Sequence, residues 1–175
     1  SRNMLSFGFF NHEDHKGDMV SDRHTKYYPE LILSSIGENL ARFTNSEKVF
    51  SPKEIVDGWM NSPEHRENIL DPGYTHLGVG VVIQENKLLA TQNFATAIAI
   101  LDKPLPPKLS RKNSYRLEFT YLSPKAWQAF NAVLRYPNPR TKYMIDDKHY
   151  TLGGEPVEIT WLDEDRFAVD LKFNA

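Results

Sequence analysis

Three residues of this sequence could contribute to one chemical site: His12, Glu38 and His65. Two imidazoles and one carboxylate could bind a divalent ion such as zinc and leave a coordination position for water. The chain has no cysteine, which excludes thiol chemistry and disulfide bonds. It also has no Walker loop, no Rossmann glycine fingerprint, no Gly-x-Ser-x-Gly turn and no His-Glu-x-x-His motif. The candidate site is therefore dispersed along the chain, and spacing alone does not bring its members together.

The position of His65 bears on its chemistry. Ser62 followed by Pro63 predicts a helix start, with Ser62 as the N-cap and His65 in the first turn. The peptide dipoles at that end disfavour an imidazolium ion and favour the neutral imidazole that a metal needs. Alternatively, a neutral His65 bonds a nearby carboxylate and holds two helices together. The local sequence is compatible with both roles.

Glu38 and Gln92 each have a structural alternative to a functional role. Glu38 follows a glycine and precedes residues 39–43, which we expect to begin a helix, and an acid in a first turn needs no function. Gln92 on a predicted strand could present its amide to a cavity, but alternating strand polarity explains it equally well.

Composition limits the partners. The 175 residues are 40% apolar and 25% charged, as in an ordinary globular protein. A net charge of −2 gives no general attraction to nucleic acid or anionic lipid, so we expect no nucleic-acid partner. No apolar run approaches the roughly 18–20 residues of a transmembrane segment. The first four residues are not a secretory signal, so any targeting segment is absent from this chain.

The chain is predicted to have two structured regions. Residues 101–112 read as a proline-rich linker between a domain of residues 1–100 and a small α+β module of residues 113–175. Serine–proline pairs predict helices that begin after Ser51, Ser62 and Ser123. The third helix is expected to end near residue 136 and to carry Trp127, Phe130 and Leu134 along one face.

Alternating and branched residues predict the strands. Residues 77–83 and 88–96 should form an antiparallel hairpin, because Glu85 and Asn86 lie between two apolar runs. Residues 115–122 alternate well enough for another strand. The remaining strands are expected to form a meander with turns at 153–154 and 163–165, and they cover residues 142–152, 156–162 and 166–173.

Five segments together resemble one family, the CAP superfamily, also called the SCP or sperm-coating-protein domain, in its bacterial form. The resemblance covers about residues 1–98. Each segment is weak alone, but their order and spacing are specific. They are Phe9-Phe10-Asn11-His12, Gly37-Glu38-Asn39, Trp59 to Leu70, Leu77-Gly78-Val79-Gly80 and Gln92-Asn93-Phe94.

The resemblance implies an α+β fold, a CAP-type α-β-α sandwich with a central antiparallel sheet. It also implies a cleft lined by two histidines and, in many members, two acidic residues. His12, Glu38 and His65 match three of these positions. The second acid, expected three residues after the tryptophan, falls at Ser62, and Glu64 could replace it by turning inward. Family members usually have a longer first helix, of which only residues 1–6 could form the end here.

The resemblance implies a secreted or surface-attached protein. Some family members bind sterols or fatty acids, some bind divalent ions, and some act through protein partners. We therefore expect an extracellular or cell-surface, non-enzymatic binding module for a protein, lipid or divalent ion, either monomeric or weakly oligomeric. No cofactor is required, although a divalent metal such as zinc could bind. One alternative is a metal-assisted hydrolase or protease using His12, Glu38 and His65. The other is sterol or fatty-acid binding and export. The module of residues 113–175 resembles no family that we recognise, and Trp127 and Trp161 are expected in its core.

Overall fold

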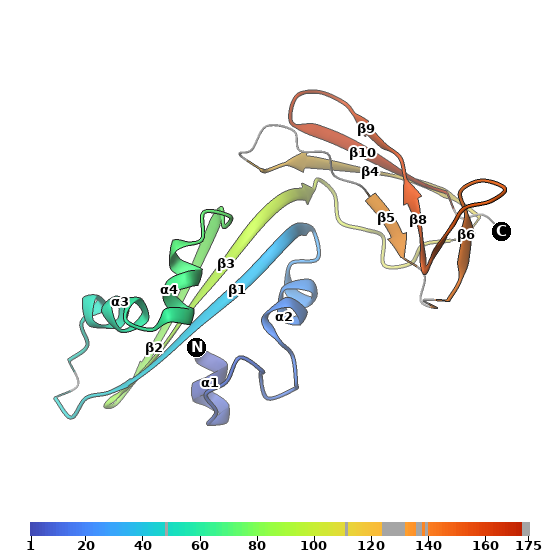
Figure 1. Ribbon diagram of the computed structural model, residues 1–175. Helices are drawn as coiled ribbons and strands as arrows, with labels where there is room; N and C mark the ends of the chain where they lie inside the picture. Colours follow the sequence, from blue (N-terminus) through green and yellow to red (C-terminus); the bar gives the residue numbers. More distant parts are fainter. Residues whose placement is uncertain (48, 111, 124–131, 136–137, 139, 173–175) are drawn as a thin grey trace. The chain divides into compact units, whose positions relative to one another are not determined.

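The structure, a computed structural model, describes residues 1–47, 49–110, 112–123, 132–135, 138 and 140–172. The chain forms two compact units, residues 1–98 and 99–175 (Figure 1). The division falls inside strand β3 (Lys87–Leu101), so the last three residues of that strand belong to the second unit. In the described residues, no helix is long and apolar enough to cross a membrane.

The first unit is built on three strands, with β3 in the middle. Strand β2 (His76–Gln84) pairs with β3 in antiparallel register and is joined to it by a tight turn at Glu85, whose φ is 53°. On the other side, β1 (Leu31–Thr44) is also antiparallel, because its bonds to β3 run from Ser35–Thr96 to Asn39–Gln92. The pairing of β2 with β3 confirms the hairpin predicted for residues 77–83 and 88–96.

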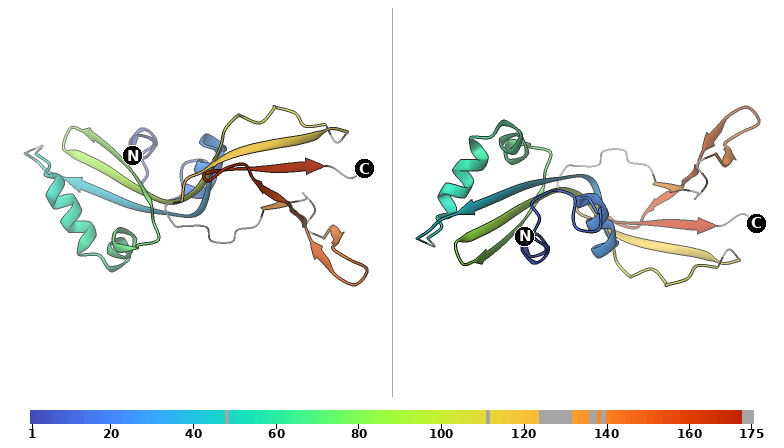
Figure 2. Two further views of the ribbon diagram at one scale, coloured as in Figure 1. Left: turned by 90° about the horizontal axis from the view of Figure 1, so that it is seen from above. Right: turned by 90° about the horizontal axis from the view of Figure 1, so that it is seen from below.

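Helices cover both faces of this sheet (Figure 2). Helices α3 (Pro52–Met60) and α4 (Pro63–Leu70) lie on one face, and α1 (Arg2–Phe7) and α2 (Val20–Tyr27) lie on the other. The helix starts predicted at Ser51 and Ser62 are confirmed, because a proline is the first residue of α3 and of α4. The start predicted after Ser123 lies outside the described residues. The arrangement of sheet and helices is the expected α-β-α sandwich.

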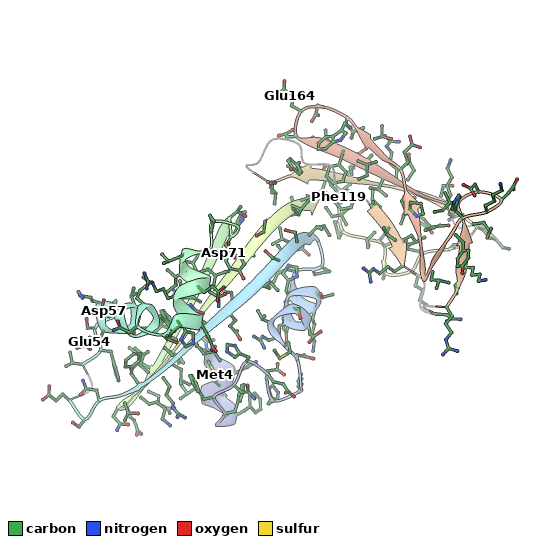
Figure 3. The ribbon with its side chains drawn as sticks, in the orientation of Figure 1. Met4, Glu54, Asp57, Asp71, Phe119 and Glu164 are labelled. Carbon is green, nitrogen blue, oxygen red and sulfur yellow. The ribbon has the colours of Figure 1, made fainter. Side chains whose placement is uncertain are left out.

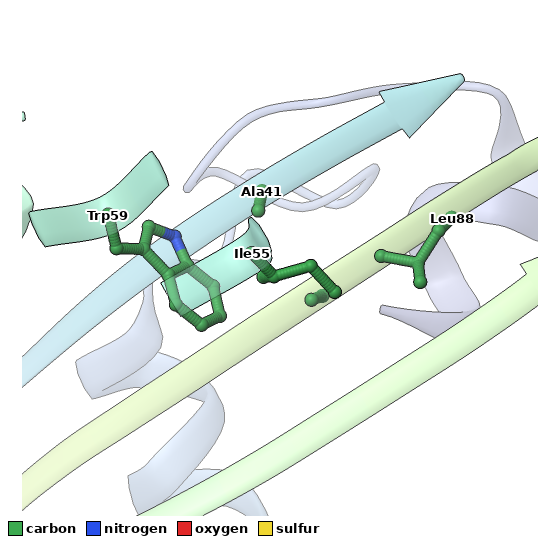
Figure 4. Packing of buried hydrophobic residues seen from close by; sticks show 5 residues of the cluster. Ala41, Ile55, Trp59 and Leu88 are labelled. Carbon is green, nitrogen blue, oxygen red and sulfur yellow. The ribbon is translucent and has the colours of Figure 1, made fainter. Parts of the chain in front are cut away.

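The strand pleat sends successive side chains into two separate cores. On the face of α3 and α4, Trp59 and Ile55 pack against Ala41 of β1 and against Leu88 and Ala90 of β3 (Figure 4). On the opposite face, Met4 of α1, labelled in Figure 3, packs against the neighbouring strand residues Leu40 and Leu89. Successive residues of one strand, such as Leu40 and Ala41, therefore pack in different cores.

Two helix predictions need correction. Residues 39–43 lie within strand β1 and not in a helix, because pairing with β3 and burial of Leu40 and Ala41 in opposite cores outweigh local helix preference. The end of the third predicted helix is strand β5 (Ala132–Arg135), which includes Leu134 and pairs with β8 (Gly154–Val157). The rest of that prediction, with Trp127 and Phe130, lies outside the described residues.

In the second unit, the predicted strand at 115–122 is confirmed as β4 (Ser114–Tyr121). The predicted meander is correct only in its last hairpin, because β9 and β10 pair around residues 163–165, whereas the other strands pair in separate groups. Strand β10 (Arg166–Lys172) lies between β4 and β9 (Ile159–Trp161), β5 pairs with β8, and β6 (Lys142–Met144) pairs with β7 (Tyr150–Leu152). Rings of Phe119, Tyr121, Trp161 and Phe167 pack together across the first group.

Candidate functional site

A cluster of three charged or titratable side chains lies on the α1 and α2 face of the first unit. Glu38 of β1 is only 5% exposed, and its two carboxylate oxygens have different partners. His12 Nδ1 donates to Oε1 at 2.9 Å, and Arg23 Nη2 donates to Oε2 at 2.6 Å. A buried carboxylate is costly unless it is paired in this way. The cluster therefore gives both oxygens of Glu38 a partner and fixes the imidazole of His12.

The elements that hold this cluster are local and tightly bonded. Arg23 lies on α2, and its Nη1 donates to the backbone carbonyls of His12 and Asp18, each at 2.8 Å. Asp14 closes the intervening loop by accepting the backbone amides of Lys16 and Asp18. The amide of Lys16 is the main reason that the pKa of Asp14 lies below its ordinary value of 3.8. Arg23 thus ties the loop that carries His12 to strand β1.

A cavity of about 440 Å³ lies beside the cluster, a size typical of small-molecule sites. Its lining combines apolar side chains with polar and charged ones, and Glu38 and Arg23 belong to it. The other lining residues are Ser1, Arg2, Asn3, Met4, Phe9, Asn11, Asp14, Leu40, Gly78, Val79, Gly80, Thr91 and Asn93. The cavity can therefore accept a ligand that has both an apolar part and a polar part.

His65 contacts β1 from the other helical layer. It lies in the first turn of α4, as predicted, and its backbone carbonyl accepts a hydrogen bond from Asn39 Nδ2 at 2.9 Å. Asn39 is fully buried, follows Glu38 on β1 and faces the opposite side of the sheet. Its Nδ2 also donates to Gln92 Oε1, and its Oδ1 accepts from Asn68 Nδ2 at 2.8 Å. This amide network attaches α4 to the sheet.

The structure brings His12 and Glu38 into contact, whereas the other predicted residues lie on or next to α4 or in the amide network beneath it. Gln92 is buried in the amide network, Ser62 is half-buried before α4, and Glu64 is exposed on α4. Of the predicted cleft residues, Glu38 lines the cavity. Assignment of His65 to the same cleft stays a prediction.

His12, Glu38 and His65 were the candidate ligands of a divalent ion, which needs several free donor atoms around one point. Among the described residues, no three His, Asp or Glu side chains are placed to hold a metal ion together. Both oxygens of Glu38 are already bonded, and the neighbouring Arg23 guanidinium repels a cation. The arrangement does not fit a His12–Glu38–His65 chelate, and we derive no metal-dependent step from it. His12 Nε2 could still serve as a single ligand oriented by Glu38.

Two contributors to these contacts, Arg23 and the Asn39–Asn68 amide pair, were not among the predicted site residues. Arg23 lies between His12 and Glu38 in the chain, but nothing in its local pattern separates it from an ordinary surface arginine of a short helix. The amide network of Asn39 and Asn68 carried a usable signal, because a strand assignment for residues 37–43 would have placed Glu38 and Asn39 on opposite faces.

Comparison with known proteins agrees with this architecture. The family model of the cysteine-rich secretory protein family, CAP, matches residues 1–94. An uncharacterised protein of Bacillus subtilis (strain 168), YkwD, is 34% identical over 94 residues, which are 54% of this chain and 33% of YkwD. YlbC of the same strain, described as an uncharacterised membrane protein, is 35% identical over 94 residues, which are 54% of this chain and 24% of YlbC.

The matched region thus spans a third or less of each relative. It contains the three-stranded sheet, its four helices and the His12–Glu38–Arg23 cluster. The chain therefore belongs to the CAP family, through its first unit.

Proposed function

We propose that the first unit is a non-enzymatic binding module, acting outside the cell or at its surface, whose ligand enters the cavity beside the His12–Glu38–Arg23 cluster. The observation that carries this proposal is the position of the cavity, of about 440 Å³, directly against a buried and fully paired carboxylate. A carboxylate with both oxygens bonded is held as a fixed structural charge and is poorly placed to attack a substrate.

The lining favours a small amphiphile, such as a fatty acid or a sterol, over a purely polar ligand. Met4, Phe9 and Leu40 offer apolar contacts. Asn11 and Asn93 offer amide groups that could bond a polar head. A ligand of this kind also suits lipid binding and export as the biological role.

Fluorescence titration of lipid-stripped protein with cis-parinaric acid tests the amphiphile. We expect saturable binding at one site per chain. Asn93→Trp should abolish it by filling the cavity, whereas Asn61→Trp, an equal change at another exposed asparagine, should leave it intact. Absence of saturable binding, or equal binding by both variants, would argue against the cavity as an amphiphile site and would direct attention to protein ligands.

A divalent ion is the other ligand class to test, with His12 Nε2 as one donor. The support for it is the His12–Glu38 bond, which engages Nδ1 and leaves Nε2 on the other side of the ring from the carboxylate. Calorimetric titration of metal-stripped protein with zinc, beside His12→Ala and His65→Ala, separates the outcomes. Saturable binding that is lost in both variants would join the two histidines in one site. Absence of binding by folded protein would remove the divalent ion as a ligand of these histidines.

Hydrolysis is a second candidate function, and the same bond favours it, because a histidine oriented by a carboxylate can act as a general base. The side chain of His12 is 45% exposed and could reach a substrate or a water molecule. A screen of peptide and ester substrates tests this activity. Turnover that His12→Ala abolishes would establish the hydrolase and overturn the binding module, and a screen without such turnover would remove this candidate.

A further inference from the structure

The outer edge of the first unit carries a row of exposed apolar side chains. In the described part of the chain, β2 pairs with β3 alone. Its odd-numbered residues from 77 to 83 point to one face, and their exposed fractions are 56% for Leu77, 63% for Val79, 54% for Val81 and 55% for Ile83. Single exposed apolar residues are common, but four in a continuous row on one strand form a patch that calls for a partner.

The helical layer ends one strand short of this row. Leu88 and Ala90 of β3 are 2% and 1% exposed, because α3 packs over them. Their direct neighbours across the β2–β3 pair are Ile83 and Val81, which are more than half exposed on the same face. Burial therefore stops abruptly between β3 and β2.

This edge also lacks the features that usually prevent strands from pairing with other molecules. Residues 76–84 contain no lysine, arginine, aspartate, glutamate or proline. The other outer strand of the unit, β1, carries Glu38 and Arg42 in its central part. A long, uncharged and apolar edge strand is a favourable template for a further strand.

We propose that β2 of a second copy of this chain pairs with this edge in antiparallel orientation, about a two-fold axis at Gly80. In that register Val79 of one copy lies opposite Val81 of the other, and Leu77 lies opposite Ile83. Each of the four residues of the exposed row thus meets another residue of that row on the same face, and both outer rows are covered laterally. Such self-complementarity is what a two-fold interface requires.

The partner is a second copy because the pattern matches itself at every position of the row. The register also places Gly80 opposite Gly80 and Gly78 opposite Val82, so no bulky or charged side chains collide at the axis. Four aliphatic side chains and one strand of backbone from each copy make a small interface, at the low end of specific contacts. The dimer should therefore be weak and dependent on concentration.

Sedimentation equilibrium over micromolar to millimolar concentrations tests the proposal. The unaltered protein should shift from the mass of one chain to twice that mass as concentration rises. Val79→Lys/Val81→Lys should raise the dissociation constant by at least about tenfold, because it places lysines opposite each other across the axis. The matched control, Ile32→Lys/Val56→Lys, changes residues that are 42% and 44% exposed on other elements and should dimerise normally.

A cross-linking experiment tests the register without relying on a charged variant that could misfold. The chain has no cysteine, so introduced thiols are unique. An oxidised equimolar mixture of Val79→Cys and Val81→Cys proteins should give far more cross-linked dimer than either protein alone. A protein that stays monomeric at millimolar concentration, a dimer unaffected by Val79→Lys/Val81→Lys, or equal cross-linking of all three samples would overturn the proposal.

Discussion

At the scale of single residues, the buried carboxylate of Glu38 organises the candidate site. Its side chain is 5% exposed, and the guanidinium of Arg23 and the imidazole of His12 satisfy one oxygen each. The cost of burying this charge is offset only while both partners are present. The three side chains should therefore behave as one energetic unit.

Arg23→Leu should lower the free energy of unfolding by about 3 kcal/mol, because it leaves a buried carboxylate with one weak partner. Urea denaturation measures the loss. Arg23→Leu/Glu38→Gln should recover part of it, since the uncompensated charge is then absent. A loss below about 1 kcal/mol in Arg23→Leu would mean that water already screens Glu38.

The loop that holds His12 should respond to acid. The pKa of Asp14 is lowered because its carboxylate accepts the amides of Lys16 and, less strongly, of Asp18. A lowered pKa means that the stabilisation is present above pH 3.8, the ordinary value, and is lost as the pH falls through the lower folded-state value. The amide chemical shift of Lys16, the main partner of this carboxylate, should titrate with a midpoint below 3.8. In Asp14→Asn this titration should disappear, and an unchanged titration there would assign it to another group.

At the scale of elements, strand β1 separates the charged cluster around Glu38 from the amide network around Asn39, although these two residues are neighbours in sequence. Glu38 faces α1 and α2, whereas Asn39 faces α4. At Gly37, the preceding residue, a side chain would collide with the Tyr74 hydroxyl, so the tyrosine would have to shift. The Gly37-Glu38-Asn39 segment is thus explained by a close approach, a buried charge and a buried amide in three successive positions.

Asn39→Leu should lower the free energy of unfolding by about 1–3 kcal/mol, because the amides of Gln92 and Asn68 and the His65 carbonyl each lose a buried partner. Chemical denaturation measures this loss. The matched control is Asn93→Leu on β3, an exposed asparagine, which should change stability by no more than about 0.5 kcal/mol. Equal effects of the two substitutions would show that the network contributes no net stability.

At the scale of the whole molecule, the chain contains two units with separate hydrophobic cores. The first has Leu88, Ile55 and Trp59 on one face of its sheet. The second packs Phe119 and Phe167, whose rings are stacked at a centroid distance of 5.0 Å. Only the first unit belongs to the region matched by the CAP family.

Leu88→Ala should destabilise the first unit by about 2–5 kcal/mol through the cavity that it creates, since Leu88 is 2% exposed. Hydrogen exchange resolves the units: amides of β2 and the first half of β3 should lose protection, while those of β4 and β10 should keep it. Phe167→Ala should give the opposite pattern. Loss of protection throughout the chain in either variant would show that the two units unfold as one.

Local signals were sufficient for several elements. Serine–proline pairs mark the starts of α3 and α4, and two apolar runs around a short polar turn mark the β2–β3 hairpin, because caps and turns depend on neighbours in sequence. The order and spacing of five short segments also identified the family and hence the sandwich fold. His12 and Glu38, two of the residues singled out, are in contact through a hydrogen bond, and their functional role stays a prediction.

Only the tertiary structure decided the rest, because it depends on contacts between residues distant in the chain. Residues 39–43 form a strand because they pair with β3. The pleat of that strand points the side chains of Glu38 and Asn39 to opposite faces of the sheet. The pairing partners of the second unit's short strands have no local code, which explains why the predicted meander is correct only in its last hairpin. Arg23 reaches Glu38 only because the fold places α2 beside β1. The apolar row of β2 is exposed because α3 covers β3 but does not extend over β2.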